Sequence, residues 1–231
     1  MKSNFLDDII GFILEKKIVS ISGESGTGKT TLALQLVSSI LLKTKPDQYQ
    51  CLWFQASEKF PKKRLASMFK DKVNLLTYLV NNIFVIPDTV IKTYSEQFNL
   101  LNQFEEKDLP LDIKVIVIDN ISHHLRYELS QKNDLGQIST IKNRFYDKLL
   151  FPLIMYCQRE EIVLLLIHEV STDIESGLIK PYYASLYNRI NGAHMSLVKQ
   201  IFNDELIMKF SSNKICKNIK YKINNEGLVI S

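Results

Sequence analysis

The sequence predicts an α/β fold built on a mainly parallel sheet, with helices on both faces and antiparallel hairpins at the C-terminal end. Three observations lead to this prediction. Apolar runs alternate with helical segments up to about residue 190, which is typical of parallel strands joined by crossover helices. A glycine-rich loop separates the first apolar run from the first long helical segment. After residue 190 the apolar runs become short, partly alternating and separated by turn residues, as in hairpins.

The elements follow in order along the 231 residues. Buried strands are expected where apolar runs of four to seven residues are bounded by polar or turn residues: 18–22, 51–56, 81–86, 114–118 and 162–167. Helices are expected where apolar residues recur at helical spacing: 29–42, 62–69, 91–104 and 135–159. The hairpin strands are expected within MSLVKQIF, ELIMKFS, NIKYKI and GLVI. No linker or repeat interrupts the pattern, so we expect a single domain spanning residues 1–231.

The composition excludes several classes of protein. With 45% hydrophobic and 23% charged residues, the chain can bury a large core and does not resemble a disordered protein. The aliphatic run 162–167 is far shorter than the ~18 residues of a membrane span, and Asp7 and Asp8 fall where a signal peptide is apolar. We therefore expect a cytoplasmic protein with no membrane partner, or a nuclear one in a eukaryote. The three cysteines lie far apart in the sequence, which argues against a zinc site or a disulfide framework. They are Cys51, Cys157 and Cys216.

The glycine-rich loop carries the strongest functional signal. GESGTGKT, residues 23–30, fits the phosphate-loop pattern GxxxxGK[ST] between a strand and a helix. Lys29 is expected to neutralise the β- and γ-phosphates of ATP, and the Thr30 hydroxyl is expected to hold Mg²⁺. The expected nucleotide-binding residues are Gly23, Glu24, Ser25, Gly26, Thr27, Gly28, Lys29, Thr30 and Thr31.

Acidic residues at the ends of two other strands complete the expected site. Asp119 ends the apolar run VIVID and is the expected second metal ligand. Asn120 follows it, so the water-activating glutamate of many ATPases is absent from that position. Glu58, just beyond the strand at 51–56, is the candidate base. The alternative is a solvated acid beside neighbouring lysines.

Several strings resemble the ATPase core of the RecA/RadA recombinase superfamily, and in particular its RadB-like paralogues. These strings are SEKFPKKRL (57–65), VIDNISHHLRYEL (117–129), HEVSTDIESGLIKP (168–181) and ICKNIKYKINNEGLVIS (215–231). The resemblance implies a RecA-like P-loop ATPase that uses ATP and Mg²⁺ as an accessory protein of homologous recombination and DNA repair. It also implies weak, non-specific binding to single- or double-stranded DNA and a full-length recombinase or another paralogue as partner.

The resemblance assigns roles to further residues. Lys29 and Glu58 become the catalytic pair, and Arg64 falls where the family stacks an arginine on adenine. His168-Glu169 replaces the family's Asn-Gln, whose glutamine senses the γ-phosphate, so we expect only slow, DNA-stimulated hydrolysis. The 22 residues before Gly23 are too few for the family's N-terminal helical DNA-binding domain. The expectation is an accessory paralogue that is monomeric or a small oligomer.

DNA contacts are expected in two segments. The net charge of +4 is concentrated near the C-terminus, and the alternation of Lys220 and Lys222 with apolar residues puts both on one face of a strand. The other lysines of this stretch are Lys209, Lys214 and Lys217. Protection of an edge strand explains these charges equally well. Residues 170–186, with the Tyr182-Tyr183 pair, correspond to the family's second DNA-binding loop.

Other classes of function remain open at this stage. A KaiC-like signalling ATPase shares the same core, and a nucleotide-binding scaffold without turnover would carry the same phosphate loop. A small-molecule phosphotransferase is disfavoured because such kinases use lid arginines and this chain has few arginines. The adjacent His123 and His124 are not expected to form a metal site, and Trp53 is expected to pack in the core.

Overall fold

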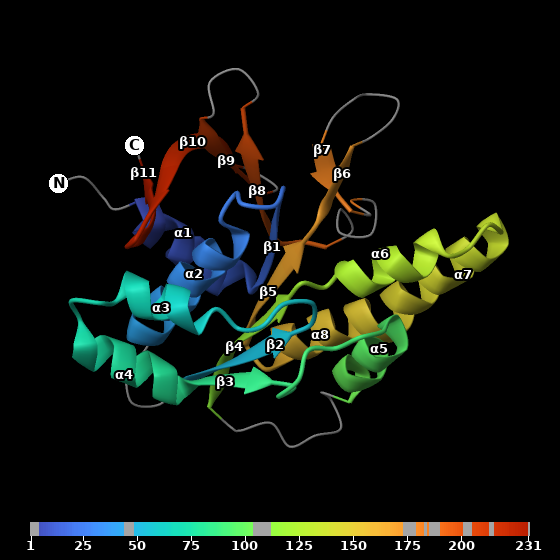
Figure 1. Cartoon of the computed structure of the whole chain (residues 1–231), viewed down its shortest axis with the longest axis horizontal. Coiled ribbons are helices and arrows are strands. Elements are labelled where there is room, and N and C mark those ends of the chain that lie inside the picture. Colours follow the sequence, from blue (N-terminus) through green and yellow to red (C-terminus); the bar gives the residue numbers. More distant parts are fainter. Residues whose placement is uncertain are drawn as a thin grey trace.

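The described residues of the chain form a nine-stranded sheet in the order β11-β10-β9-β8-β1-β5-β4-β2-β3 (Figure 1). The computed structural model describes residues 5–43, 49–103, 112–172, 179–182, 184, 190–200, 205–212 and 215–230. The strands of the parallel half are β1 (Ile18–Gly23), β2 (Gln50–Gln55), β3 (Ile83–Ile86), β4 (Ile113–Asp119) and β5 (Val163–His168). A separate two-stranded ribbon consists of β6 (Val170–Thr172) and β7 (Ile179–Pro181).

The parallel half of the sheet is apolar on both faces. Along β4, Val115 and Val117 point into one hydrophobic cluster, while Ile116 and Ile118 point into the other. A strand covered on both sides has no need for polar alternation, which is why these strands appear in the sequence as unbroken apolar runs. β1 lies at the centre, between β5 and β8, and is parallel to both.

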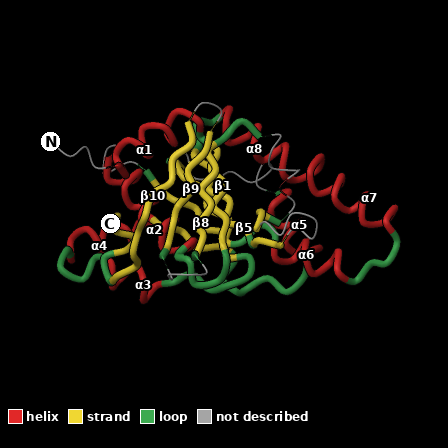
Figure 2. The backbone as a smooth tube through the Cα atoms, turned by 90° about the horizontal axis from the view of Figure 1, so that it is seen from above, coloured by secondary structure: helices red, strands yellow, loops and turns green. Residues whose placement is uncertain are grey.

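Helices cover both faces (Figure 2). One cluster contains residues from α1 (Phe5–Lys16), α2 (Lys29–Lys43), α3 (Lys62–Met68) and α4 (Val73–Asn82). The other contains residues from α5 (Tyr94–Asn102), α6 (His123–Ser130), α7 (Leu135–Phe145), the π-helix η1 (Tyr146–Leu150) and α8 (Phe151–Arg159). The doubly covered parallel sheet confirms the predicted fold class.

The C-terminal strands extend the sheet beyond β1. They are β8 (Ala193–Lys199), β9 (Leu206–Ser212), β10 (Ile215–Asn224) and β11 (Gly227–Ile230). β8 is parallel to β1 and antiparallel to β9, so it joins the two halves of the sheet. β9, β10 and β11 then pair antiparallel, which confirms the predicted hairpins. Tyr221 on β10 is buried, and its hydroxyl donates to the Thr27 carbonyl at 2.7 Å.

Some boundaries differ from the prediction. The strand expected at 81–86 begins at Ile83, because α4 continues through Asn82. The helix expected at 135–159 is three consecutive helical segments, with the π-helix η1 between α7 and α8. Pro152 lies in the first turn of α8 and has no backbone N–H, so the α-helical hydrogen-bond pattern is interrupted there. Helices α1, α4 and α6 were not predicted. Within the described ranges, no helix has the length and apolar character needed to cross a membrane.

Candidate functional site

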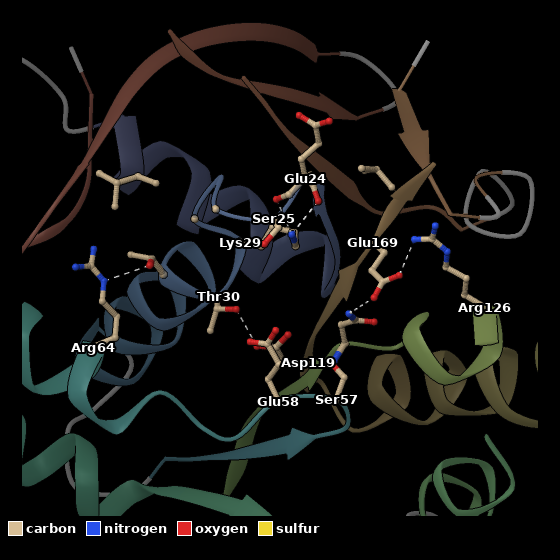
Figure 3. Close-up of a pocket in the computed structure, with 17 residues that line it drawn as sticks. Glu24, Ser25, Lys29, Thr30, Ser57, Glu58, Arg64, Asp119, Arg126 and Glu169 are labelled. Carbon is tan, nitrogen blue, oxygen red and sulfur yellow. Dashed lines mark hydrogen bonds and ion pairs between the residues drawn. The ribbon is translucent and has the colours of Figure 1, made fainter. Parts of the chain in front are cut away.

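The carboxyl ends of β1, β5, β4 and β2 meet at one edge of the sheet, where they border a pocket of about 640 Å³ (Figure 3). This edge is where α/β proteins bind ligands, because loops that follow parallel strands converge there. The lining residues are Gly23, Glu24, Ser25, Gly26, Gly28, Lys29, Thr30, Thr31, Ser57, Glu58, Arg64, Asp119, Asn120, Arg126, Glu169, Val170 and Ile223. The pocket thus brings together nearly all of the residues expected from the sequence, although they come from distant segments.

The loop between β1 and α2 has the geometry of a phosphate cradle. Lys29, the first residue of α2, donates from Nζ to the carbonyl oxygens of Gly23 and Glu24, each at 2.8 Å. Gly28 has φ +91°, a conformation that L side chains rarely adopt, and a Cβ there would lie 2.9 Å from Ile223 Cδ1. The loop therefore requires glycine at this position. Its backbone and the N-terminus of α2 can meet phosphate oxygens at close range.

Thr30 and Asp119 meet at the base of the pocket. The Thr30 hydroxyl donates to Asp119 Oδ2 at 2.9 Å, although 89 residues separate the two in sequence. Burial raises the pKa of Asp119 to about 6; the Thr30 hydrogen bond lowers it and the nearby charge of Glu58 raises it. A hydroxyl and a buried carboxylate side by side form the donor set that Mg²⁺ takes when it is also bound by substrate phosphates.

Glu58 lies beside Asp119, as labelled in Figure 3. It is positioned by the loop after β2, because the N–H groups of Ala56 and Ser57 donate to the Asp119 carbonyl at 2.8 and 3.3 Å. Both carboxylates contribute to the electrostatic environment of Lys29. Burial lowers the pKa of Lys29, and Asp119, Glu169, Glu58 and Glu24 oppose that effect.

Arg64 lies at the opposite end of the pocket from Glu169 (Figure 3). Its Nε donates to Thr31 Oγ1 at 3.2 Å and its second guanidinium nitrogen to the Asn224 carbonyl at 2.6 Å. These bonds hold the guanidinium between α2 and the end of β10. Ile223, which also lines the pocket, comes from the same strand end. The C-terminal hairpin thus contributes to the pocket, a contribution that the sequence did not predict.

Sequence reasoning also missed Arg126. It lies on α6, and it donates to Glu169 Oε2 at 3.0 Å, while Asn120 Nδ2 donates to Glu169 Oε1 at 3.4 Å. Glu169, which stands where the family has a glutamine, is in the pocket lining. The one available signal was the scarcity of arginine, since Arg126 is among only five in the chain and follows the Asp119 strand closely.

Several other sequence candidates lie outside the pocket. Thr27 is buried, and its hydroxyl donates to the Glu24 carbonyl at 2.8 Å within the loop. His124 is buried against the Ala56 carbonyl at 2.9 Å, and Trp53 is fully buried in the core as predicted. Among the described residues, no group of three or more histidine, cysteine or acidic side chains could hold a metal ion.

The C-terminal lysines do not form one patch. Lys220 and Lys222 are exposed on the same face of β10, as predicted, and Lys209 joins them because it pairs with Asn218 across the strands. Lys217 has the opposite parity and projects from the other face. Lys220 is ion-paired with Glu205 at 2.8 Å. Lys214 and Tyr183 lie outside the described residues, as does much of the segment 170–186.

The charges in the pocket suit a nucleotide that carries a divalent cation. The lining contains four carboxylates and three cationic side chains, so it is not positive overall. The carboxylates are Glu24, Glu58, Asp119 and Glu169, and the cations are Lys29, Arg64 and Arg126. A bare triphosphate would meet repulsion there, whereas Mg²⁺ beside Thr30 and Asp119 would offset it.

The fold and pocket define a P-loop protein with a RecA-like core, and comparisons with known proteins agree. Residues 6–151 match the family described as "AAA domain", and the chain belongs to this family of P-loop ATPases. The crystal structure of the RadB recombinase superposes with a TM-score of 0.68 at 17% identity, covering 91% of this chain and 89% of that one. This match supports the fold.

Proteins similar in sequence to this chain are DNA repair and recombination proteins. The chain is 24% identical over 231 residues to the DNA repair and recombination protein RadB of Archaeoglobus fulgidus, covering 98% of this chain and 95% of that protein. It is 25% identical to RadB of Methanococcoides burtonii, covering 84% and 80%. It is 30% identical over 133 residues to the DNA repair protein RAD57 of Saccharomyces cerevisiae, but these are 55% of this chain and only 29% of RAD57. The chain is thus similar to RadB proteins over most of its length, which supports the RadB-like resemblance to the RecA/RadA superfamily noted from its sequence.

Proposed function

We propose that this protein binds ATP with Mg²⁺, hydrolyses it slowly with stimulation by DNA, and acts as an accessory paralogue in homologous recombination and DNA repair. The observation that carries the proposal is the Thr30–Asp119 hydrogen bond at the base of a pocket that Lys29 and Glu58 also line. A phosphate cradle, a metal donor pair and a candidate base are then within one cavity. Its volume of about 640 Å³ is in the range of small-molecule sites.

Each residue has a definite part in this proposal. The loop residues 23–31 bind the phosphates, Lys29 neutralises their charge, and Thr30 and Asp119 hold the metal, which supplies charge neutralisation at the phosphates. Glu58 accepts a proton from the attacking water. Arg64 and Ile223 enclose the adenine end, where the guanidinium plane and an aliphatic side chain both suit a flat base. Slow turnover is expected because Glu169 stands where the family has a glutamine.

The DNA-repair role is supported by the relatives, which are named as DNA repair and recombination proteins. DNA binding would be weak and independent of sequence, since lysines meet phosphates as point charges. We propose a full-length recombinase or another paralogue as partner. A single-domain protein in the cytoplasm, or in the nucleus of a eukaryote, fits this role.

The decisive experiment compares ATP turnover with and without single-stranded DNA for the wild type, Glu58→Gln and Glu160→Gln. Glu160 is an exposed acid paired with Arg159, so its substitution is the matched control. We expect slow turnover that DNA accelerates in the wild type and control, and none in Glu58→Gln, with ATP affinity nearly intact. Equal turnover by Glu58→Gln would place the base elsewhere.

Two results would favour the alternatives. ATP binding without turnover in the wild type, with or without DNA, would indicate a nucleotide-binding scaffold. Turnover that DNA leaves unchanged would favour a KaiC-like signalling ATPase on the same core. Each result contradicts a different part of the proposal, since the first removes hydrolysis and the second removes the link to DNA.

A further inference from the structure

The carboxylate of Glu169 is held by three side chains. Arg126 donates to Oε2 at 3.0 Å, while His123 Nδ1 and Asn120 Nδ2 lie 2.8 and 3.4 Å from Oε1. Burial of Glu169 raises its pKa, but the hydrogen bonds from these partners outweigh burial and leave the pKa below its ordinary value. Glu169 is therefore a fixed negative charge on the pocket wall.

This charge lies at the end of the pocket that would receive the terminal phosphate. The lysine of a phosphate loop contacts the β- and γ-phosphates, and the negative charge of Glu169 acts directly on Lys29. Figure 3 shows Glu169 on the far side of Lys29 from Arg64. A bare carboxylate at this position would repel the γ-phosphate, whereas the remainder of the nucleotide would be affected much less.

Arg126 is held in place from both sides. One guanidinium nitrogen bonds to Glu169, and the guanidinium carbon lies 5.3 Å from the centre of the Tyr182 ring. The backbone N–H of Tyr182 in turn donates to the Glu169 carbonyl at 2.8 Å. The arginine is therefore oriented before any ligand arrives, so its charge is available without reorganisation.

We propose that Arg126 is a positioning residue that neutralises Glu169 and thereby lets this pocket accept a nucleoside triphosphate in preference to a diphosphate. This inference rests on the proposed nucleotide binding. Removal of Arg126 leaves four carboxylates and two cations in the pocket lining. The additional negative charge of the γ-phosphate then meets a carboxylate that has lost its arginine partner, while ADP does not extend that far.

The test measures the ratio of the Kd for ADP to the Kd for ATP. Fluorescent ADP and a fluorescent non-hydrolysable ATP analogue would be titrated with Mg²⁺ at low ionic strength. We expect Arg126→Ala to weaken binding of the ATP analogue about tenfold more than binding of ADP. Arg159→Ala removes an exposed, ion-paired arginine outside the pocket lining and should leave the ratio unchanged.

A second substitution separates charge pairing from a merely structural role. Glu169→Gln removes the negative charge, so adding it to Arg126→Ala should restore the ratio to near the wild-type value. Glu169→Gln alone should raise the preference for the triphosphate several-fold, because Arg126 then faces the phosphate without its partner. Both effects should shrink as salt is added, since the Arg126 and Glu169 side chains are partly exposed.

Specific results would overturn the inference. If Arg126→Ala weakens both nucleotides equally, or if Glu169→Gln fails to restore the ratio, the ion pair does not set the preference. Should Arg126→Ala fail to fold, an unchanged ratio in Glu169→Gln alone would have the same meaning. If the wild type binds neither nucleotide, the proposed function falls together with this inference; if it binds both and the ratio never moves, only the inference falls.

Discussion

Replacing Asp119 with asparagine should stabilise the nucleotide-free protein at neutral pH while weakening its binding of Mg²⁺ and ATP. Asp119 is 8% exposed, and burial raises its pKa from 3.8 to about 6. A carboxyl whose pKa is higher in the folded state stabilises the fold fully below pH 4, and this contribution is lost as the pH rises to about 6 and above. At pH 7.5 the ionised Asp119 is a cost to the folded protein.

The size of that cost follows from the pKa difference. A shift from 3.8 to about 6 corresponds to about 3 kcal/mol of unfolding free energy. Asparagine has nearly the same shape and keeps an oxygen that can accept the Thr30 hydroxyl. We therefore expect Asp119→Asn to raise the unfolding free energy at pH 7.5 by about 2 kcal/mol and to have little effect at pH 4.

The assay is urea denaturation without nucleotide and with a chelator, at pH 4 and pH 7.5. Fluorescence of Trp53, the only tryptophan and fully buried, reports the unfolding. Asp71→Asn, at an exposed position, is the matched control. With Mg²⁺ and ATP present, the wild type should gain stability and Asp119→Asn should gain much less. If Asp119→Asn is no more stable than the wild type at pH 7.5, or if the difference persists at pH 4, ionised Asp119 does not destabilise the folded protein.

Three further predictions concern the loop and the C-terminal hairpins. In a thermal or urea titration, ATP with Mg²⁺ at a hundredfold excess over Kd should stabilise the wild type by about 2.7 kcal/mol and should stabilise Lys29→Ala far less. If ATP leaves the unfolding of the wild type unchanged, the loop is not a phosphate site. Tyr221→Phe removes the 2.7 Å bond to the Thr27 carbonyl and should lower the unfolding free energy in urea by about 1–2 kcal/mol; no loss would mean that the bond is not a support of the loop. Binding of single-stranded DNA by the outer face of β10 would be measured by fluorescence anisotropy across a salt series. Each lysine replaced on that face should reduce the magnitude of the slope of log K against log salt by about 0.7. The control Lys217→Ala, on the other face, should change the slope less. An unchanged slope would mean that the lysines on this face only protect the strands against aggregation. These lysines are Lys209, Lys220 and Lys222.

Much of the site could be predicted from the sequence because its chemistry is local. A phosphate loop needs consecutive backbone N–H groups, a lysine and a hydroxyl, so residues 23–30 are recognisable without the fold. Asp119 was recognisable because it ends an apolar strand, and parallel strands bring such ends to one edge. The alternation of apolar runs and helical segments also predicted the doubly covered sheet. A strand that is buried on both faces is apolar at nearly every position, and this can be recognised in the sequence of each strand.

The phosphate-loop pattern, the acidic residue at the end of β4 and the alternation of apolar and helical segments are all local features of the sequence. Which distant groups meet in the pocket depends on the tertiary fold. Arg126 and Glu169 are 43 residues apart, and Tyr221 bonds to Thr27 across 194 residues. The pairing of β9 with β10 also determined which face of the sheet each C-terminal lysine occupies, and it placed Lys217 and Lys220 on opposite faces. Such contacts leave no local pattern in the sequence. Two side chains meet because of where they lie in the folded chain, and the packing of the whole sheet determines those positions.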